Sequence, residues 1–402
     1  MILLTTRRRQ AGEGGISEYA TKAGPRFLIK YTARRADGTQ RVVLKRGFTT
    51  RKAAAAALRA EIRRLEVGEW VEPTKQRLDA YLAEWVAGQR LSASTLSSYG
   101  KNIRLHVDPY LGETTLARLT GAAVDAWMRT LEASGRADGT GGLSPRTVRY
   151  VYTILRSALS DAVRYGRLSV NPTDRSTPPS PSQARPPEMQ AWTAGELVRF
   201  LRWAEARDPD LAMGWRLLAV TGMRRGEVLA LRWRDVDLDA GRLQVRRSVG
   251  SVKTKGAGEQ LVEGRTKTGQ ARVVDIDADT VAALRAYRAT RGSLSLELVR
   301  DAALVLGTLE GKHRHPERYS RRFVEQVVQA RKALGEDQLP RIRLHDLRHT
   351  HATLLLAAGE PVKVVSERLG HASATITLIV YQHVHPGMGR QAADRFAALL
   401  RG

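Results

Sequence analysis

A histidine and an arginine with the spacing to act together lie in the segment His345–His349, which reads His-Asp-Leu-Arg-His. His345 and Arg348 are three residues apart, so both fall on one face of a helix. Arginine is a permanently charged, planar fork that binds two phosphate oxygens at once. A histidine that exchanges a proton, beside an arginine that stabilises negative charge, has the chemistry of phosphoryl transfer.

The same segment also invites a metal-binding interpretation, because His345 and His349 at positions i and i+4 share a helix face, as in zinc hydrolases. Two features disfavour it. Asp346 stands where the His-Glu-x-x-His motif has its general-base glutamate, and Arg348 would bring a guanidinium beside a dication. The chain also has no P-loop and no Gly-x-Gly-x-x-Gly after a strand. We therefore expect neither a metal nor a cofactor.

Three other segments offer partners for these residues. Residues 221–227 read Thr-Gly-Met-Arg-Arg-Gly-Glu, which indicates a helix end followed by a new helix. Arg224 would then lie near a helix N-terminus, where anions are favoured. Further on, a Leu-Gly dipeptide precedes His371, and Tyr381 follows ten residues later. The apolar, Thr-rich residues 373–380 between them could position the tyrosine without burying it rigidly.

In this order and spacing, the segments resemble the motifs of the tyrosine recombinase (phage integrase) family. Each of these motifs can occur by chance on its own, but four of them in the order and spacing of the family are a specific signal. The resemblance covers all of residues 191–402, and the preceding part of the chain resembles the heterobivalent, three-domain integrases of the family. The matching residues are Thr-Gly-Met-Arg224-x-x-Glu227, His345-x-x-Arg348-His349-Thr350, Leu-Gly-His371 and Tyr381.

The resemblance implies a role for each matching residue. Tyr381 would be the nucleophile that attacks the scissile phosphate and forms an O-(3′-phospho-DNA)-tyrosine intermediate. Arg224 and Arg348 would hold the non-bridging oxygens as charge builds up in the transition state. His345 would handle the tyrosine proton or hold the phosphate, and His371 would donate a further hydrogen bond.

Two further positions complete the implied site. Glu227 would orient the first arginine rather than take part in the reaction. The family also uses a lysine in a β-hairpin as general acid to the 5′-oxygen leaving group, and Lys267, in Thr-Lys-Thr-Gly-Gln-Ala-Arg, matches best. The family pattern usually carries a serine and a basic pair after this lysine, and here the stretch is one residue short. Lys253 and Lys255 therefore remain alternatives.

The composition favours a polyanionic partner. Lysine and arginine number 66 against 41 acidic residues, a net charge of +25, which favours nucleic acid over a small-molecule substrate. The absence of cysteine excludes disulfides and thiolate chemistry and fits a reducing cytosol. No apolar run reaches the ~18 residues of a membrane helix, and the N-terminus lacks the pattern of a secretory signal. We expect a cytoplasmic, nucleoid-associated protein without a membrane partner.

A multidomain, mainly α fold must position these residues. Residues 1–72 hold 16 Lys or Arg against 7 Asp or Glu, with β-like runs at 26–32 and 41–46 and a helix at 51–67 that Thr50 can cap. This small basic α+β domain is interpreted as an arm-type DNA-binding domain; a generic appendage is the alternative. Residues 73–175 are predicted to form a helical core-binding (SAM-like) domain, with helices at 92–106, 121–134 and 144–165, the last with Pro145 in its first turn.

A Pro-rich extended linker at 176–190 is expected to lead into a catalytic domain, residues 191–402, that is mainly α with a small antiparallel sheet. A capping box at 193–196 opens its first helix. A Pro-Gly-rich break at 386–389 should precede a short amphipathic helix at 390–401, which we expect to dock on a neighbouring protomer rather than on its own domain. Further helices are predicted at 211–221, 226–232, 278–290, 317–334, 345–358 and 361–368, and β-like runs at 242–249, 271–276 and 304–306.

Together these features predict a site-specific DNA recombinase, an integrase that cuts and rejoins DNA for the integration or excision of a mobile element. Its partners would be double-stranded DNA with core-type and arm-type sites, three further protomers in a homotetramer on synapsed DNA, and a directionality factor. A type IB topoisomerase would share the cationic cluster and the tyrosine but would not need the basic N-terminal module. A non-catalytic regulator with a degenerate recombinase fold is disfavoured, because every catalytic position is filled.

Overall fold

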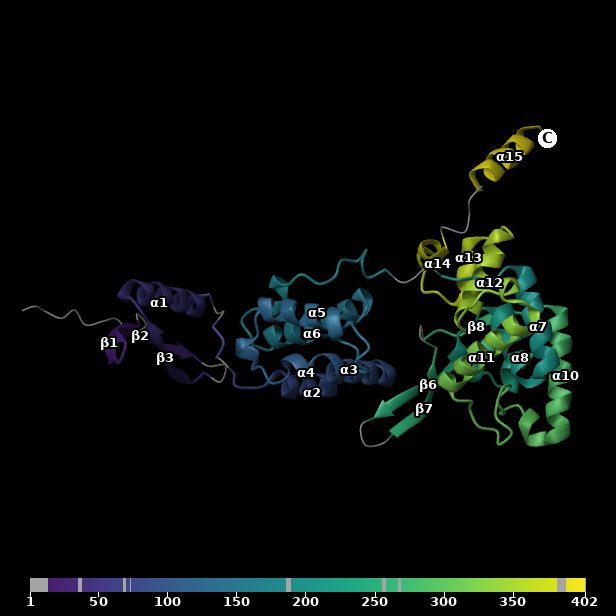
Figure 1. Ribbon diagram of the computed structural model, residues 1–402. Helices are drawn as coiled ribbons and strands as arrows, with labels where there is room; N and C mark the ends of the chain where they lie inside the picture. Colours follow the sequence, from purple (N-terminus) through teal and green to yellow (C-terminus); the bar gives the residue numbers. More distant parts are fainter. Residues whose placement is uncertain are drawn as a thin grey trace, which may run out of the picture. The chain divides into compact units, whose positions relative to one another are not determined.

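The computed structural model divides the chain into two compact units, Met1–Pro186 and Pro187–Gly402 (Figure 1). The boundary falls inside the proline-rich stretch 176–190. In the described part of the chain, no helix has the length and apolar character needed to span a bilayer. The structure describes residues 14–34, 38–67, 70–72, 74–185, 189–254, 258–266, 269–381 and 388–401.

The first unit contains a three-stranded antiparallel sheet, ordered β1-β2-β3, that packs against one helix. Thr50 caps this helix, as the sequence predicts, by accepting a hydrogen bond from the backbone N–H of Ala53 at 3.1 Å. Inward-facing residues of β2 such as Tyr31 pack with Leu58 of the helix. The elements are β1 (Gly15–Thr21), which the sequence did not indicate, β2 (Gly24–Arg34), β3 (Gln40–Phe48) and α1 (Arg51–Glu66).

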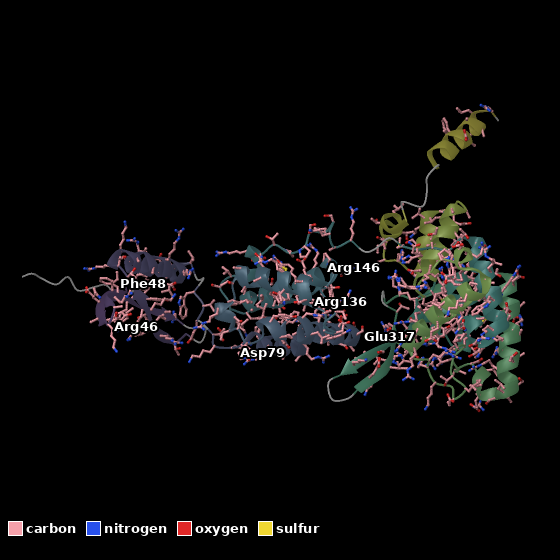
Figure 2. All side chains as sticks on the ribbon, viewed as in Figure 1. Arg46, Phe48, Asp79, Arg136, Arg146 and Glu317 are labelled. Atoms are coloured by element: carbon pink, nitrogen blue, oxygen red, sulfur yellow. The ribbon has the colours of Figure 1, made fainter. Side chains whose placement is uncertain are left out.

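The opposite face of this sheet is open to solvent. Val42 and Leu44 on β3 are 51% and 50% exposed. Next to them, the guanidinium of Arg46 lies 5.9 Å from the ring centroid of Tyr19 (Figure 2). A solvent-facing sheet that combines cations with apolar and aromatic side chains supports a polyanionic partner.

A helical bundle makes up the rest of the first unit. On its longest helix, α6, buried residues recur every three or four positions, among them Val148, Leu155 and Leu159, so this face forms the core of the bundle. Ser144 caps α6, and Pro145 occupies the first turn as predicted. The helices are α2 (Leu78–Gly88), α3 (Ala93–His106), α4 (Asp108–Leu111), α5 (Gly121–Ser134) and α6 (Pro145–Arg164), with short 3-10 helices at Leu116–Arg118 and Pro172–Arg175.

The first half of the predicted linker is fixed to this bundle rather than extended away from it. The backbone N–H of Thr177 donates to Oδ1 of Asp125 at 2.9 Å, and Nη1 of Arg149 donates to the backbone oxygen of Pro179 at 2.5 Å. The proline content of the stretch removes backbone donors, so side chains of α5 and α6 satisfy its polar groups instead.

The second unit is mainly helical, with two small antiparallel sheets. One sheet has the order β4-β5-β8, and the other is the hairpin β6-β7. The predicted run 304–306 forms only an isolated bridge between Leu304 and Arg232. The helices are α7 (Ala194–Arg207), α8 (Pro209–Thr221), α9 (Arg225–Leu229), α10 (Ala278–Leu294), α11 (Pro316–Leu334), α12 (Asp346–Ala357), α13 (Val362–Leu369), α14 (Ala374–Tyr381) and α15 (Met388–Arg401). The strands are β4 (Val236–Asp237), β5 (Arg242–Val245), β6 (Arg247–Thr254), β7 (Gly258–Arg265) and β8 (Arg272–Asp275), and 3-10 helices lie at Trp233–Asp235, Leu296–Val299 and Glu336–Gln338.

An aromatic cluster forms the centre of this unit. Trp215 of α8 packs edge-on against Phe323 of α11, with ring centroids 5.1 Å apart, and Phe323 in turn contacts Phe200 of α7. Trp192 packs on Phe200 and donates its backbone N–H to Oγ1 of Thr350 at 3.0 Å, which ties the start of the unit to α12. Helix α12, whose first turn contains Arg348, is therefore held directly against this core.

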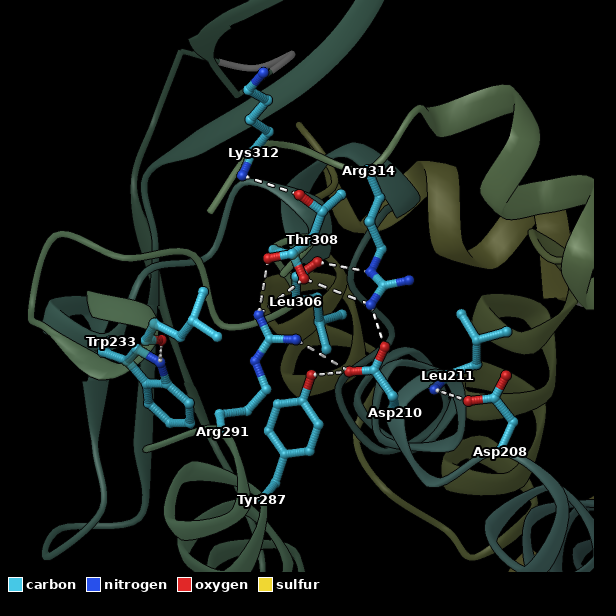
Figure 3. Close-up of polar contacts among 12 residues, drawn as sticks. Asp208, Asp210, Leu211, Trp233, Tyr287, Arg291, Leu306, Thr308, Lys312 and Arg314 are labelled. Carbon is cyan, nitrogen blue, oxygen red and sulfur yellow. Dashed lines mark hydrogen bonds and ion pairs between the residues drawn. The ribbon is translucent and has the colours of Figure 1, made fainter. Parts of the chain in front are cut away.

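A polar network around the partly exposed Asp210 joins α8, α10 and the loop before α11 (Figure 3). The carboxylate of Asp210 accepts hydrogen bonds from the hydroxyl of Tyr287 at 2.7 Å and from Arg314. Arg291, which is 3% exposed, pairs with the same carboxylate and donates to the backbone oxygens of Gly307 and Thr308. The network holds the loop that contains Gly307, Thr308 and Arg314 in place between α8 and α10.

Candidate active site

Arg224 is held at the N-terminus of α9 by Glu227. The backbone N–H of Arg224 donates to Oε2 of Glu227, and its Nη1 donates to Oε1, both at 2.9 Å. Its Nη2 donates to the backbone oxygen of Gly370 at 3.3 Å. The Glu227 side chain is fully buried, whereas that of Arg224 is 25% exposed, so the carboxylate orients a guanidinium that an anion can still reach.

Arg272, the first residue of β8, belongs to the same network, which the sequence analysis did not predict. Its Nη2 donates to Oε2 of Glu227 at 2.7 Å, and its Nε donates to the backbone oxygen of Arg368 at 3.0 Å. Burial on its own would raise the pKa of Glu227, but hydrogen bonds and charge from Arg272, together with Arg224, hold that pKa below its ordinary value. Glu227 is therefore a carboxylate shared by two arginines.

Arg348 lies in the first turn of α12 and is 3% exposed. Its Nη1 donates to the backbone oxygen of Gly222 at 2.7 Å. Gly222 ends α8 with φ at 63°, and a Cβ there would lie 2.7 Å from side-chain atoms of His351 and Leu369, so only glycine fits. The turn that presents Arg224 thus also receives Arg348.

His345 directly precedes α12, and its ring meets that of His349 edge-on, with centroids 5.0 Å apart. The His345 side chain reaches the surface, but protein atoms crowd it closely. Loss of hydration, followed by the proximity of His349 and the charge of Arg348, lowers the pKa of His345 to about 4. At neutral pH its ring is uncharged and has a nitrogen lone pair that can accept a proton.

His371 follows Gly370, which ends α13 in the left-handed region with φ at 66°. Nδ1 of His371 lies 2.8 Å from Oγ1 of Thr377 on α14. Burial, followed by the charges of Arg348 and Arg224, lowers the pKa of His371 to about 4. The same two arginines also act on His345, so the structure brings four of the predicted residues, with Glu227 behind them, into one cationic cluster.

His351 has a supporting position in this cluster. It is 7% exposed, and its Nδ1 lies 2.8 Å from the backbone oxygen of Ala219. Nε of Arg368 donates to its Nε2 at 3.2 Å. Burial and the charge of Arg368 lower the pKa of His351 to about 4, so the ring is neutral and its proton is on Nδ1. His351 therefore packs α12 against α8.

Tyr381 and Lys267 are located only through their neighbours. Tyr381 is the last residue of α14, and its side chain lies outside the described structure. Lys267 lies outside the described residues. The described residues that flank this gap are joined by a hydrogen bond from the backbone N–H of Gly269 to the backbone oxygen of Thr266, at 2.8 Å. Of the two alternative lysines, Lys253 on β6 pairs with Glu259 across the hairpin at 3.6 Å, and Lys255 lies outside the described residues.

The hairpin that precedes Lys267 is attached to the domain by two histidine–glutamate pairs. Nε2 of His313 lies 2.9 Å from Oε2 of Glu263, and Nε2 of His315 lies 3.1 Å from Oε1 of Glu259. The structure shows that their loop supports β7, from which the chain runs directly into the Lys267 segment.

The cluster has the electrostatic character of a phosphate site. Two oriented guanidiniums provide donors for the oxygens of a phosphodiester, and two neutral histidines provide hydrogen bonds and a proton acceptor. Within the described ranges, no three His, Cys, Asp or Glu side chains come together as a group that could hold a metal ion.

Comparison with known proteins agrees with this arrangement. Residues 193–388 match the model of the phage integrase family. The integrase of Mycobacterium phage D29 is 28% identical over 376 residues, covering 90% of this chain and 91% of the phage protein. The tyrosine recombinase XerC of Xanthomonas campestris is 25% identical over 342 residues, covering 81% and 93%.

Solved structures show the same fold. The Tn1549 transposon integrase in complex with a circular intermediate DNA matches 80% of this chain and 100% of its own, with a TM-score of 0.65 at 19% identity. A lambda integrase, solved as a tetramer bound to a Holliday junction, matches 89% and 96%, with a TM-score of 0.55 at 19% identity. The fold of these integrases and the cationic cluster are thus both present in this chain. Its residues 193–388 form a domain of the phage integrase family.

Proposed function

We propose that this protein is a site-specific DNA recombinase that cuts and rejoins DNA through a 3′-phosphotyrosyl intermediate, and that it integrates or excises a mobile element. The observation that carries the proposal is the convergence of Arg224 and Arg348 on two neutral histidines, at the place where α14 leads to Tyr381. The phage and transposon origin of the related integrases supports a mobile-element role.

In the proposed reaction, the phenolic oxygen of Tyr381 attacks the scissile phosphorus. A bond forms between the two atoms, and the bond to the 5′-oxygen breaks. His345, neutral at pH 7 without DNA, accepts the phenolic proton because the negative charge of the bound phosphate raises the pKa of its ring again, and Lys267 protonates the departing 5′-oxygen. A 5′-hydroxyl from the partner duplex then attacks the phosphotyrosine, which restores the phosphodiester. The steps balance without ATP, because the bond energy is retained in the tyrosyl link.

Arg224, Arg348 and His371 contribute by stabilising charge. The two guanidiniums bind the non-bridging oxygens, whose charge is redistributed in the transition state, and they are already oriented by Glu227 and Gly222. Preorganised donors of this kind lower the barrier because they need not reorient during the reaction. His371 donates a further hydrogen bond to the same phosphate.

The proposed partners follow from the domains. Residues 1–72 would bind arm-type DNA sites, 73–175 and 191–402 would clasp the core site, and 176–190 would connect them. Exchange between two duplexes requires four protomers, assisted by a directionality factor, in the cytoplasm at the nucleoid. On α15, Phe396 and Leu400 are 63% and 73% exposed, which supports the docking of this helix on a neighbouring protomer.

A type IB topoisomerase is the alternative with the same chemistry. It would relax supercoiled DNA of any sequence, whereas a recombinase needs two matched sites. The test uses two plasmids that carry the attachment-type sequences flanking the gene, incubated with the purified protein in EDTA without ATP. The proposal expects joint molecules only when both sites are present. Relaxation of either plasmid without joint molecules would support the topoisomerase, and strict dependence on zinc would support a metallohydrolase.

A further inference from the structure

One hydrogen bond connects the phosphate-binding cluster to the helix that bears the tyrosine. It joins Nδ1 of His371 to Oγ1 of Thr377, 2.8 Å apart. Thr377 is completely buried and lies on α14 four residues, about one helical turn, before Tyr381. A buried hydroxyl needs a partner, and for Thr377 that partner is the imidazole.

The backbone of His371 is fixed independently of this bond. Its N–H donates to the backbone oxygen of Ser366 at 3.1 Å, and the preceding Gly370 accepts from Nη2 of Arg224. Arg272 also holds the end of α13 through the backbone oxygen of Arg368. With the backbone held in this way, the remaining freedom is in the ring: its rotation, and which nitrogen bears the proton.

The proton position decides what His371 can do. A neutral imidazole has one N–H and one lone pair. If the hydroxyl of Thr377 donates to Nδ1, the proton is on Nε2, and the ring can donate to an anion. If Nδ1 donates to Oγ1 instead, Nε2 carries only a lone pair and would repel a phosphate oxygen. The groups whose charges act on His371 are Arg348, Arg224, His349 and Arg272, a setting that attracts anions.

We propose that Thr377 is a positioning residue of the active site: its hydroxyl donates to Nδ1 of His371, which holds the ring as an Nε2–H donor and fixes α14 next to the cluster. The bond forms only when α14 is docked, so the same contact prepares the phosphate donor and presents Tyr381. This inference rests on the proposed function, because it assigns the Nε2–H group to the scissile phosphate.

The first test measures the tautomer directly in the DNA-free protein. Long-range ¹H–¹⁵N NMR of the ¹⁵N-histidine-labelled full chain distinguishes the two tautomers, and the signals lost in His371→Asn identify the residue. The wild type should show His371 with its proton on Nε2, and Thr377→Val should show a mixture of both forms. A wild-type His371 with its proton on Nδ1 would overturn the inference, whatever the protein does to DNA.

The second test measures single-turnover cleavage of a suicide core-site DNA. Thr377→Val, which keeps the branched shape and loses the hydroxyl, should slow cleavage at least tenfold with DNA affinity within twofold of wild type. Thr377→Ser should restore cleavage to within threefold of wild type. Thr375→Val, at an exposed position of the same helix, is the matched control and should behave as wild type. Wild-type cleavage by Thr377→Val would contradict the proposal.

A double variant separates positioning from helix packing. If Thr377 acts through His371, adding Thr377→Val to His371→Ala should slow cleavage no further than His371→Ala alone. Additive losses would mean that Thr377 only packs α14, and the inference would fall. Persistence of the covalent adduct in Tyr381→Phe would instead refute the proposed function while leaving the tautomer result intact, so the two failures are distinguishable.

Discussion

Arg272 and Glu227 form a buried ion pair, with Nη2 of the arginine 2.7 Å from Oε2 of the glutamate. The Glu227 side chain has no exposed surface, and the same carboxylate accepts hydrogen bonds from Nη1 of Arg224 on Oε1 and from the backbone N–H of Arg224 on Oε2. The pair thus connects the strand that follows the Lys267 segment to the arginine proposed to bind the phosphate. Its loss should affect both stability and catalysis.

Arg272→Leu should lower the free energy of unfolding by about 3–5 kcal/mol, because it leaves a buried carboxylate with one of its two cations removed. Arg242→Leu is the matched control, since Arg242 pairs with Asp275 in the same sheet but at an exposed position, where such a pair contributes roughly 0–1 kcal/mol. Urea unfolding measures both. Equal losses in the two variants would contradict the supporting role of Arg272.

Arg224→Lys and Arg348→Lys should each slow DNA cleavage by about 10²–10³, or about 2.7–4 kcal/mol, because a point charge cannot replace an oriented, two-pronged donor. Arg225→Lys is the control, since Arg225 is adjacent in sequence but pairs with Glu317 and Ser320 instead. Single-turnover cleavage provides the readout. If both substitutions left cleavage within threefold of wild type, the two arginines would not bind the phosphate.

Acid should destabilise the protein well before its carboxylates are protonated. The folded-state pKa of His351 is lowered to about 4, whereas the unfolded chain has the ordinary value near 6.5. Between these values the unfolded state binds more protons, so stability falls as the pH drops from about 6.5 to 4. For His351 alone the loss between pH 7.5 and pH 5 is about 2 kcal/mol.

Urea unfolding of the wild type and of His351→Gln at both pH values measures this contribution. The variant is expected to be less stable throughout, because it loses the hydrogen bonds to Ala219 and Arg368. It should nevertheless lose less stability on acidification than the wild type does. An identical pH dependence in the two proteins would show that His351 is not held neutral in the folded state.

Removal of residues 1–72 should leave cleavage at the core site partly intact and abolish protection of a second, arm-type class of site. The physical basis is the excess of Lys and Arg in this segment and the open sheet face that bears Arg46 and Tyr19. Binding by these cations releases counterions, so the lost contribution should be strongly salt-dependent. Footprinting compares DNA protection by the full-length and truncated proteins. If the truncated protein still protected the arm-type sites, residues 1–72 would not be the arm-binding domain.

The starts of several helices could be predicted from the sequence, because they depend on residues that are close together in the chain. Thr50, Pro145 and the capping box at Thr193 and Glu196 each identified a helix start, because capping depends on residues within one turn. The strand β1 was missed because its residues Gly15–Thr21 alternate only weakly, although it pairs with β2 in a tight hairpin that turns between Thr21 and Gly24. Residues 304–306 were expected as a β-like run, but only the bridge from Leu304 to Arg232 forms.

The motif residues of the candidate site could be named from the sequence because their types and order are specific. Their supporting partners could not, because those contacts connect positions far apart in the chain. Arg272 reaches Glu227 across 45 residues, and nothing local distinguishes it from the many other arginines. For Thr377 a signal existed: it lies one turn before Tyr381 between Ile376 and Leu378, and a hydroxyl that is buried there must find a partner.

The nucleophilic role of Tyr381 is tested most directly by trapping the covalent complex. Wild-type protein and Tyr381→Phe are incubated with a nicked suicide substrate containing the core site and separated on a denaturing gel. Both should bind the DNA with similar affinity, because the phenyl ring keeps its packing. The wild type should form a protein–DNA adduct linked through a 3′-phosphate, and the variant should form none. An adduct of normal yield in Tyr381→Phe would contradict the account.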